Sequence, residues 1–293
     1  EEAFYKLMGM QTPPPEIRED AGEIEAAIDH KLPDLVELKE VRGDLHLHSN
    51  YPIKNPSHGP GVDSIEEMVE KAKKLGYEFV GISDHPPGHG VVSKNEIISW
   101  VKKRTKFIQK INEQSSSTNK STKGIRVLNG LEIDILGDGS LSVPDEALET
   151  LDYVIAGIHS GHRGGKDVIT QRLMKALNNI HVDIISHPTN RLLNERESSE
   201  ADWEEIFKYA AKDNKLLEIN GYPNRLDLRD DLVRQAINFG VKFIINTDAH
   251  EVTQMDNMLF GVSVARRGWA EKMDIVNSWD WTDFAKWFRI KLL

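Results

Sequence analysis

The chain has 293 residues, of which 39% are hydrophobic, a formal net charge of −10 and no cysteine. This composition excludes disulfide scaffolds and thiolate metal sites, and no stretch approaches the roughly 20 apolar residues of a membrane span. The first residues lack the basic and apolar regions of a secretory signal, so we expect a cytoplasmic protein with no membrane partner. The acidic balance argues against a surface that coats nucleic acid, but it is compatible with one phosphate-binding site.

Residues 1–40 differ in composition from the rest of the chain. A short helical pattern at Phe4, Leu7 and Met8 is followed by prolines at 13–15 and an acidic stretch. Consecutive prolines favour an extended, semi-rigid connector. We therefore expect a linker, or the tail of a preceding domain, over 1–40 and one main domain over 41–293.

From residue 41 onward, short apolar runs alternate with polar segments of helix length. This alternation predicts an α/β barrel of seven parallel strands separated by helices. The strands are expected at 41–48, 79–85, 125–135, 152–159, 182–187, 215–220 and 242–248. The helices are expected at 64–75, 94–113, 166–179, 202–213 and 229–239.

Local signals indicate where some of these helices begin and end. Ser64 and Asp202 are predicted N-caps, whereas Gly76 and Gly240 are predicted to follow helix ends. The polar segment 114–123 predicts an exposed, mobile loop. The tryptophan-rich end of the chain predicts a terminal helix that packs on the barrel.

Six of the apolar runs end in side chains that bind metal ions. Because the carboxyl ends of parallel barrel strands converge on one mouth, we expect these side chains to meet there. His46 and His48 alternate with leucines, so both imidazoles point to the same side of their strand. Chance or ordinary surface exposure is the alternative for a single His-x-His pair, but Asp248-Ala-His250 repeats the arrangement. The runs are Asp44–His48, Gly81–His85, Asn129–Glu132, Ala156–His159, Ile184–His187 and Ile245–His250.

These motifs resemble those of the PHP domain, the polymerase and histidinol phosphatase family. The resemblance covers about residues 41–270. The motifs agree with those of the family in their order, in their spacing and in the small residues that flank them. It implies a distorted seven-stranded (β/α)7 TIM-like barrel, the PHP fold, with phosphoesterase activity and up to three divalent metal ions. The matching segments are Asp44–Ser49, Ser83–His85, Gly130–Glu132, Ile158–Ser160, Ser186–Pro188 and Asn246–His250.

The resemblance also implies a set of metal ligands. Glu132 would bridge two ions, and Glu132 and Asp248 would be central to catalysis. A third ion would require a residue from the loop after the first strand, in addition to His85 and His250. The ligands implied for the first two ions are His46, His48, Glu132 and Asp248 for the first, and Glu132, His159 and His187 for the second.

The loop after the first strand departs from the family pattern. Many relatives that resemble family X polymerases have an aspartate five residues after the second histidine, where this chain has Ile53. The segment Ser57-His58-Gly59 precedes the next helix much as the missing ligand would. We expect His58 to complete the third site. Asp63 is the alternative ligand, and a vacant third site is the remaining alternative.

Histidine and carboxylate ligands suit zinc, manganese or iron, and the sequence does not choose among them. Neighbouring ions share a bridging water, lower its pKa and clamp the oxygens of a phosphate, so we expect phosphoester hydrolysis by a bridging hydroxide. Arg191 and Arg225 follow strand-end motifs and are candidates for substrate binding. A salt-bridged surface role is the alternative for each arginine.

A second resemblance concerns the segment before the barrel. Pro14–Glu19, Gly22–Ala27 and Leu32–Val36 look like the join between the polymerase and PHP portions of bacterial and archaeal family X DNA polymerases, and so does Gly261–Trp269. It implies action on DNA 3′ ends in DNA repair, as a 3′ to 5′ exonuclease, 3′-phosphatase or abasic-site endonuclease, with an upstream polymerase domain as a partner. A small-molecule phosphatase of the histidinol-phosphatase type is the alternative. A structural module without activity is the third hypothesis.

Overall fold

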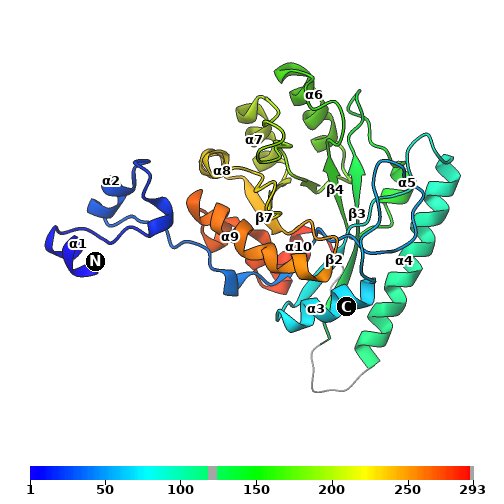
Figure 1. Cartoon of the computed structure of the whole chain (residues 1–293), viewed down its shortest axis with the longest axis horizontal. Coiled ribbons are helices and arrows are strands. Elements are labelled where there is room, and N and C mark those ends of the chain that lie inside the picture. The colour runs from blue at the N-terminus through cyan, green and yellow to red at the C-terminus, as the bar shows by residue number, and fades with distance from the viewer. Residues whose placement is uncertain (118–123, 291–293) are drawn as a thin grey trace.

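The computed structural model describes residues 1–117 and 124–290 (Figure 1). Its centre is a seven-stranded sheet in which all strands are parallel and neighbours follow in chain order. The predicted α/β barrel of seven strands is therefore confirmed. The strands are β1 (Gly43–Asp44), β2 (Phe79–Ile82), β3 (Arg126–Asp134), β4 (Tyr153–Gly157), β5 (Ile184–Ile185), β6 (Leu216–Asn220) and β7 (Lys242–Asn246).

The barrel is nearly closed between its first and last strands. The His48 amide donates to the Ala249 carbonyl at 2.8 Å, and the Ala249 amide donates to the His46 carbonyl at 3.2 Å. This seam brings the ligand-bearing segments 44–48 and 246–250 side by side.

The first strand is shorter than its apolar run. The predicted strand 41–48 is regular only over β1, because the amides of residues 45–47 bond to side chains instead of a neighbouring strand. The Leu47 amide donates to Ser83 Oγ at 3.1 Å, and the Leu45 amide donates to Asn246 Oδ1 at 2.9 Å. Side-chain acceptors thus replace the ladder where the histidines lie.

Helices follow most of the strands and surround the barrel (Figure 1). The Ser64 side chain accepts the Glu67 amide and the Asp202 side chain accepts the Glu205 amide, which confirms both predicted N-caps. The α-helices are α1 (Glu2–Leu7), α2 (Glu23–Ile28), α3 (Ile65–Lys74), α4 (Lys94–Ser117), α5 (Asp145–Leu148), α6 (Lys166–Leu177), α7 (Trp203–Lys212), α8 (Asp230–Ile237), α9 (Met258–Arg267) and α10 (Trp281–Trp287). Short 3-10 helices lie at Pro15–Ile17, Leu38–Glu40, Val252–Asn257, Lys272–Asp274 and Val276–Ser278.

Helix α4 is longer than its sequence predicted. It was expected over 94–113, but it extends to Ser117 and so includes the first four residues of the polar segment 114–123. Serine and glutamine tolerate a helix that packing elsewhere has already formed. The predicted loop is wrong for these four residues, and 118–123 lie outside the described residues.

Helix α10 closes the amino-terminal end of the barrel. Phe284 stacks on Phe79 of β2 with ring centroids 4.0 Å apart, and both side chains are fully buried. Leu45 and Tyr153 belong to the same apolar cluster inside the barrel. The predicted terminal helix on the barrel is therefore confirmed.

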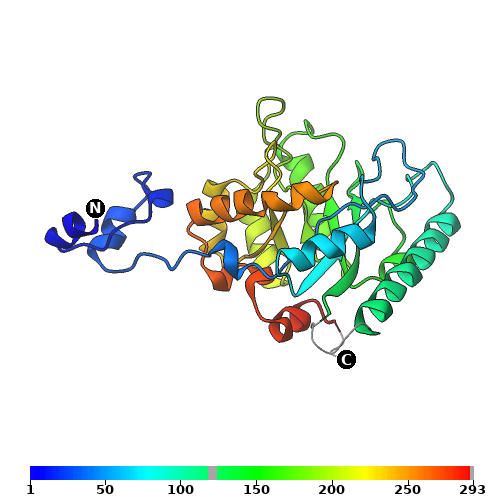
Figure 2. The same ribbon diagram turned by 60° about the horizontal axis from the view of Figure 1, so that its bottom comes forward.

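The segment before the barrel contributes no strand to the sheet, and α1 and α2 project beyond the end of α9, away from the barrel (Figure 2). Arg266 Nε of α9 donates to Glu16 Oε1 at 2.8 Å, and Leu35 forms an antiparallel bridge with Glu271. Helix α1 buries none of its side chains. Among the helices in the described ranges, none combines the length and apolarity needed to cross a membrane.

Candidate metal centre

Glu132 lies at the centre of a ring of histidines at the carboxyl ends of the strands. It belongs to β3, and only 1% of its surface is exposed. Its two oxygens face imidazole nitrogens from four other segments of the chain. Oε2 lies 3.0 Å from Nε2 of His46, 3.1 Å from Nε2 of His85 and 3.4 Å from Nε2 of His48, and Oε1 lies 2.9 Å from Nε2 of His187 and 3.2 Å from Nε2 of His159.

Asp248 completes a four-residue group. Its Oδ1 lies 3.3 Å from His48 Nε2 and 3.5 Å from His46 Nε2. Together with Glu132, these residues offer ligand atoms within 4.8 Å of one another, and all four residues are buried. Two other groups also have ligand atoms within 4.8 Å of one another but are only partly buried, namely His85, Glu132 and His159, and His58, Asp134 and His159. Because Glu132 belongs to two groups, it has the placement of a bridging carboxylate.

The ring nitrogens fit metal ligation better than hydrogen bonding. His46 Nε2 and both nitrogens of His48 are buried and form no hydrogen bond within the described ranges, although carboxylate oxygens lie close to them. His187 Nδ1 is likewise unpartnered there. Burying a polar atom without a partner costs free energy, which ligation of an ion would offset. The donor set, imidazole nitrogen and carboxylate oxygen, suits divalent transition metals.

Charge interactions favour the ligating, ionised form of Glu132, and burial favours the ligating, neutral form of His85, whereas the carboxylates around His46 favour its protonated form. Burial would raise the pKa of Glu132, but the imidazoles around it, His46 first, hold that pKa well below its usual range. Burial opposes charge on His46, yet neighbouring carboxylates, Glu132 first, raise its pKa well above normal. For His85, burial prevails and lowers the pKa well below normal. Ionised carboxylates and neutral imidazoles are the species that bind metals.

Glu218 supports the cluster and was missed by the sequence analysis. It is fully buried in β6, lies 2.6 Å from His46 Nδ1 and accepts the His187 amide at 2.8 Å. Imidazoles that bind metals usually donate their second N–H to a carboxylate or carbonyl, which fixes the ring. The available signal was a single charge inside the apolar run Leu216–Asn220.

Asp134 was also missed. It ends β3 two residues after Glu132, so strand periodicity places both side chains on the same face. Its Oδ1 lies 2.7 Å from His159 Nδ1 and 3.0 Å from His58 Nε2. Although burial opposes ionisation, hydrogen bonds from these two imidazoles lower the pKa of Asp134. One carboxylate therefore orients two of the predicted ligands.

The residues expected at the third ion are only partly together. His58 stacks on His85 with ring centroids 3.8 Å apart. His250 instead stacks on His48 at 4.2 Å, and its side chain is 41% exposed. Asp63, the alternative ligand, uses Oδ2 to accept a backbone amide at 2.7 Å. The structure thus gathers His58 and His85, with His250 one ring away.

The two arginines predicted to bind substrate have different surroundings. Arg225 Nε lies 3.3 Å from Asp248 Oδ2, and its buried Nη1 has no hydrogen-bond partner in the part of the chain that the structure describes. Arg191 donates instead to the backbone carbonyls of Arg225 and Leu226. Among the described residues, Arg225 therefore has a free donor beside the candidate metal ligand Asp248, whereas Arg191 holds the loop that carries Arg225.

A buried ion pair aligns two of the ligand segments. Arg104 of α4 donates from Nε to Asp84 at 2.8 Å, and Asp84 accepts the Ser49 amide at 2.5 Å. Asp84 directly precedes His85, and Ser49 directly follows His48. The pair thus fixes the spacing between two segments of the mouth.

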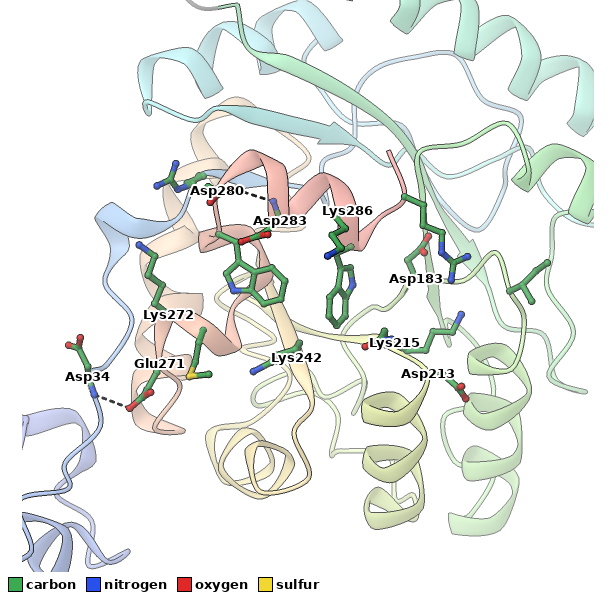
Figure 3. Close-up of a pocket in the computed structure, with 17 residues that line it drawn as sticks. Asp34, Asp183, Asp213, Lys215, Lys242, Glu271, Lys272, Asp280, Asp283 and Lys286 are labelled. Atoms are coloured by element: carbon green, nitrogen blue, oxygen red, sulfur yellow. Dashed lines mark hydrogen bonds between the residues drawn. The ribbon is translucent and has the colours of Figure 1, made fainter. Parts of the chain in front are cut away.

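A separate cavity, shown in Figure 3, has a lining that, over the described residues, does not include those of the metal cluster. It has a volume of about 1020 Å³, and Trp279, Trp287 and several charged side chains line it. Lys242 pairs with Asp274 at 2.9 Å, so part of this charge is already satisfied. The described lining includes no residue of the metal cluster, so the catalytic chemistry is assigned to the barrel mouth and not to this cavity.

Three comparisons with known proteins bear on this site. The family model for the PHP domain matches residues 44–221. The chain is 39% identical over 278 residues, 95% of its length, to "DNA polymerase/3'-5' exonuclease PolX" of Bacillus subtilis (strain 168), of which it covers 46%. It is 29% identical over 206 residues to a "Probable phosphatase" of Caldicellulosiruptor saccharolyticus. The aligned region covers 67% of this chain and 77% of that protein.

Among solved structures, the chain is similar to a histidinol phosphate phosphatase from Lactococcus lactis in complex with zinc, L-histidinol and phosphate. The TM-score is 0.49 and the identity 17%, over 77% of this chain and 94% of the other. The chain spans about half the length of the PolX protein that it matches.

The barrel and the histidine and carboxylate cluster at its mouth define a metal-dependent phosphoesterase. The chain belongs to the PHP domain family, whose model matches more than half of its residues.

Proposed function

We propose that this protein hydrolyses phosphodiester bonds at DNA 3′ ends in DNA repair, as a 3′ to 5′ exonuclease or, on modified ends, as a 3′-phosphatase or abasic-site endonuclease. The observation that carries the proposal is the extent of the likeness to PolX. It covers 95% of the chain, so it extends beyond the PHP match and takes in most of residues 1–40. We infer that this segment links the barrel, residues 41–293, to an upstream polymerase domain.

The proposed metal centre holds up to three ions of zinc, manganese or iron. When bound, the ions supply Lewis acidity and a nucleophile near neutral pH. Glu132 and Asp248 are the proposed catalytic carboxylates, because both face the same pair of histidines. The proposed ligands are His46, His48, Glu132 and Asp248 for the first ion, Glu132, His159 and His187 for the second, and His58, His85 and His250 for the third.

Arg225 is the proposed contact for a non-bridging phosphate oxygen. Its unpartnered Nη1 is a charged donor within reach of Asp248, where the phosphate would lie. Arg191 would act on substrate indirectly, through the backbone of the Arg225 loop.

The test is hydrolysis by the full chain after loading with manganese or zinc. The substrates are a 3′-tailed oligonucleotide, histidinol phosphate and an aryl phosphate. We expect shortening of the oligonucleotide from its 3′ end with the highest kcat/KM, and no shortening by Glu132→Gln. A preference for histidinol phosphate, with an intact oligonucleotide, would overturn the proposal.

The second candidate function is hydrolysis of a small phosphomonoester. The observation in its favour is the match to a probable phosphatase. This chain covers 77% of that protein but only 46% of PolX. The same three substrates separate the two functions.

A further inference from the structure

Helix α4 carries a concentration of positive charge in an acidic protein. Its 24 residues include six lysines and arginines and two glutamates, whereas the whole chain has a net charge of −10. Arg104 is buried against Asp84, so it does not contribute to the surface. Four exposed lysines remain along the middle of the helix, namely Lys102, Lys103, Lys106 and Lys110.

These four side chains share one side of α4. One row along the helix consists of lysines four residues apart, Lys102, Lys106 and Lys110, and Lys103 lies beside this row. The opposite side buries Ile97, Val101, Ile108 and Ile111 in the core. The lysines form no ion pair with any residue in the described ranges, although many other lysines of the chain do. Helix α4 packs on the core through its other side only. Its row of unpaired lysines is therefore available to a ligand.

The first turns of α4 lie at the barrel mouth. Trp100 Nε1 donates at 2.7 Å to the carbonyl of Pro52, in the loop that also carries His58. A hollow of about 240 Å³ separates this loop from α4, and Pro52, Lys54, Pro87 and Trp100 are among its lining residues. Figure 1 shows α4 at the edge of the barrel, with the loop beside its upper end. The row of lysines therefore runs from the neighbourhood of the metal ligands down the side of the molecule.

We propose that the lysine face of α4 binds the phosphate backbone of a single DNA strand whose 3′ end lies in the metal centre. This inference rests on the proposed function and extends it to substrate recognition. A helix rises about 1.5 Å per residue, so lysines four residues apart follow one another at about 6 Å along its axis. That spacing suits contacts to successive phosphates of an extended strand. The hollow at Trp100 lies between α4 and the loop that carries His58, where a base can stack on the indole.

The chemistry of the face favours a polyanion over a protein groove. Asn95 and Ser99 share a shallow hollow with Lys102, Lys103 and Lys106, and Ile98 is the only apolar residue in its described lining. Lysines contact the charged phosphates and do not distinguish the bases. Binding is therefore expected to be independent of the DNA sequence and strongly dependent on salt concentration.

The test compares two triple variants of the full, metal-loaded chain. Lys102→Gln/Lys106→Gln/Lys110→Gln removes three charges from the α4 face. Lys74→Gln/Lys212→Gln/Lys286→Gln removes three exposed lysines from α3, α7 and α10, and none of these forms an ion pair with another described residue. Glutamine preserves helix propensity in both. Binding of a single-stranded oligonucleotide of about 20 nucleotides, with phosphorothioate linkages at its 3′ end, is measured by fluorescence anisotropy across a salt series.

Each phosphate contact to single-stranded DNA contributes about 0.7 to the slope of log K against log salt, so the α4 variant should lose about 2 from that slope. Its affinity at low salt should fall more than about tenfold, while kcat/KM for an aryl phosphate is unchanged. The control variant should keep the wild-type slope. Equal slopes for the two triple variants, with hydrolysis of the unmodified oligonucleotide by the wild type, would overturn this inference and leave the proposed function intact. A wild type that neither binds the phosphorothioate oligonucleotide nor hydrolyses the unmodified one would overturn both.

Discussion

The carboxylate of Glu132 lies close to five imidazoles, so a substitution at this residue should affect several candidate ligands at once. We predict that Glu132→Gln lowers kcat by more than about 100-fold, the upper end for loss of a supporting residue. Glutamine removes both the negative charge and one of the two oxygens that can bind ions. Activity and metal content of the same preparation are the measurements, with His58→Ala as the milder comparison. Near-normal turnover with unchanged metal content would contradict the bridging role.

Asp134 orients His58 and His159 through one oxygen. We predict that Asp134→Asn weakens binding of at least one ion by 10- to about 100-fold, because an uncharged amide oxygen is a weaker acceptor for two imidazole N–H groups than the carboxylate oxygen that it replaces. Metal titration of chelator-treated protein measures the change. Asp63→Asn is the matched control, since asparagine retains an oxygen for the backbone amide that Asp63 accepts. If both variants bind metal equally, Asp134 has no orienting role.

Asp227 is a buried acid with an unusual effect on stability. Burial raises its pKa to about 6, despite hydrogen bonds from the Thr189 amide and hydroxyl. The unfolded chain releases the same proton near pH 4. Between these values the folded state binds more protons than the unfolded state. The Asp227 contribution therefore lowers the free energy of unfolding as pH rises from about 4 to about 6.

We predict that Asp227→Asn removes this dependence. The free energy of unfolding of the variant minus that of the wild type should increase by up to about 3 kcal/mol as pH rises from about 4 to about 6. Urea unfolding at several pH values measures it, and taking the difference cancels the titration of groups common to both proteins. A difference that stays constant with pH would show that Asp227 titrates normally.

At the scale of elements, α10 is the closing element of the barrel core. Phe284 stacks on Phe79 and is fully buried. We predict that Phe284→Ala costs 3 to about 5 kcal/mol of stability, as large-to-small aromatic changes in cores do. Because α10 lies at the end opposite the mouth, metal stoichiometry should not change. Urea denaturation and metal analysis test the two parts, and loss of metal from the folded variant would show coupling between the two ends.

The elements differ in how far the sequence predicted them. Strands and ligand segments were predictable because apolar runs of strand length end in histidine or carboxylate, and the barrel brings such ends together. The truncation of β1 was not, since it depends on Ser83 and Asn246, which are distant in sequence. Glu218 was missed because a charge inside an apolar strand has no periodic partner. The position of His250 over His48 depends on how β1 and β7 meet, which no local pattern contains.

At the scale of the whole molecule, the cluster concentrates buried charge at one end of the barrel. Bound ions would neutralise Glu132 and Asp248 and partner the free imidazole nitrogens, so they stabilise the folded state by mass action. At about 1,000 times Kd this amounts to about 4 kcal/mol, and for a protein of this size the melting temperature should fall on the order of 10 °C on metal removal. Calorimetry before and after EDTA treatment measures the shift. Identical melting temperatures would indicate that no ion binds the folded state preferentially.

The seam between the first and last strands also affects how this protein is made. Thr247 donates to Asp44, 203 positions earlier in the chain, beside the proposed ligands of the first ion. In a zinc finger the ligands are close in sequence, and the metal can drive folding. Here the proposed first site contains residues that follow the first and the last strand, so loop closure over almost the whole domain precedes its completion. On this proposal, a nascent chain on the ribosome has no complete first site until β7 and Asp248 have emerged, and metal loading is a late event in its biosynthesis.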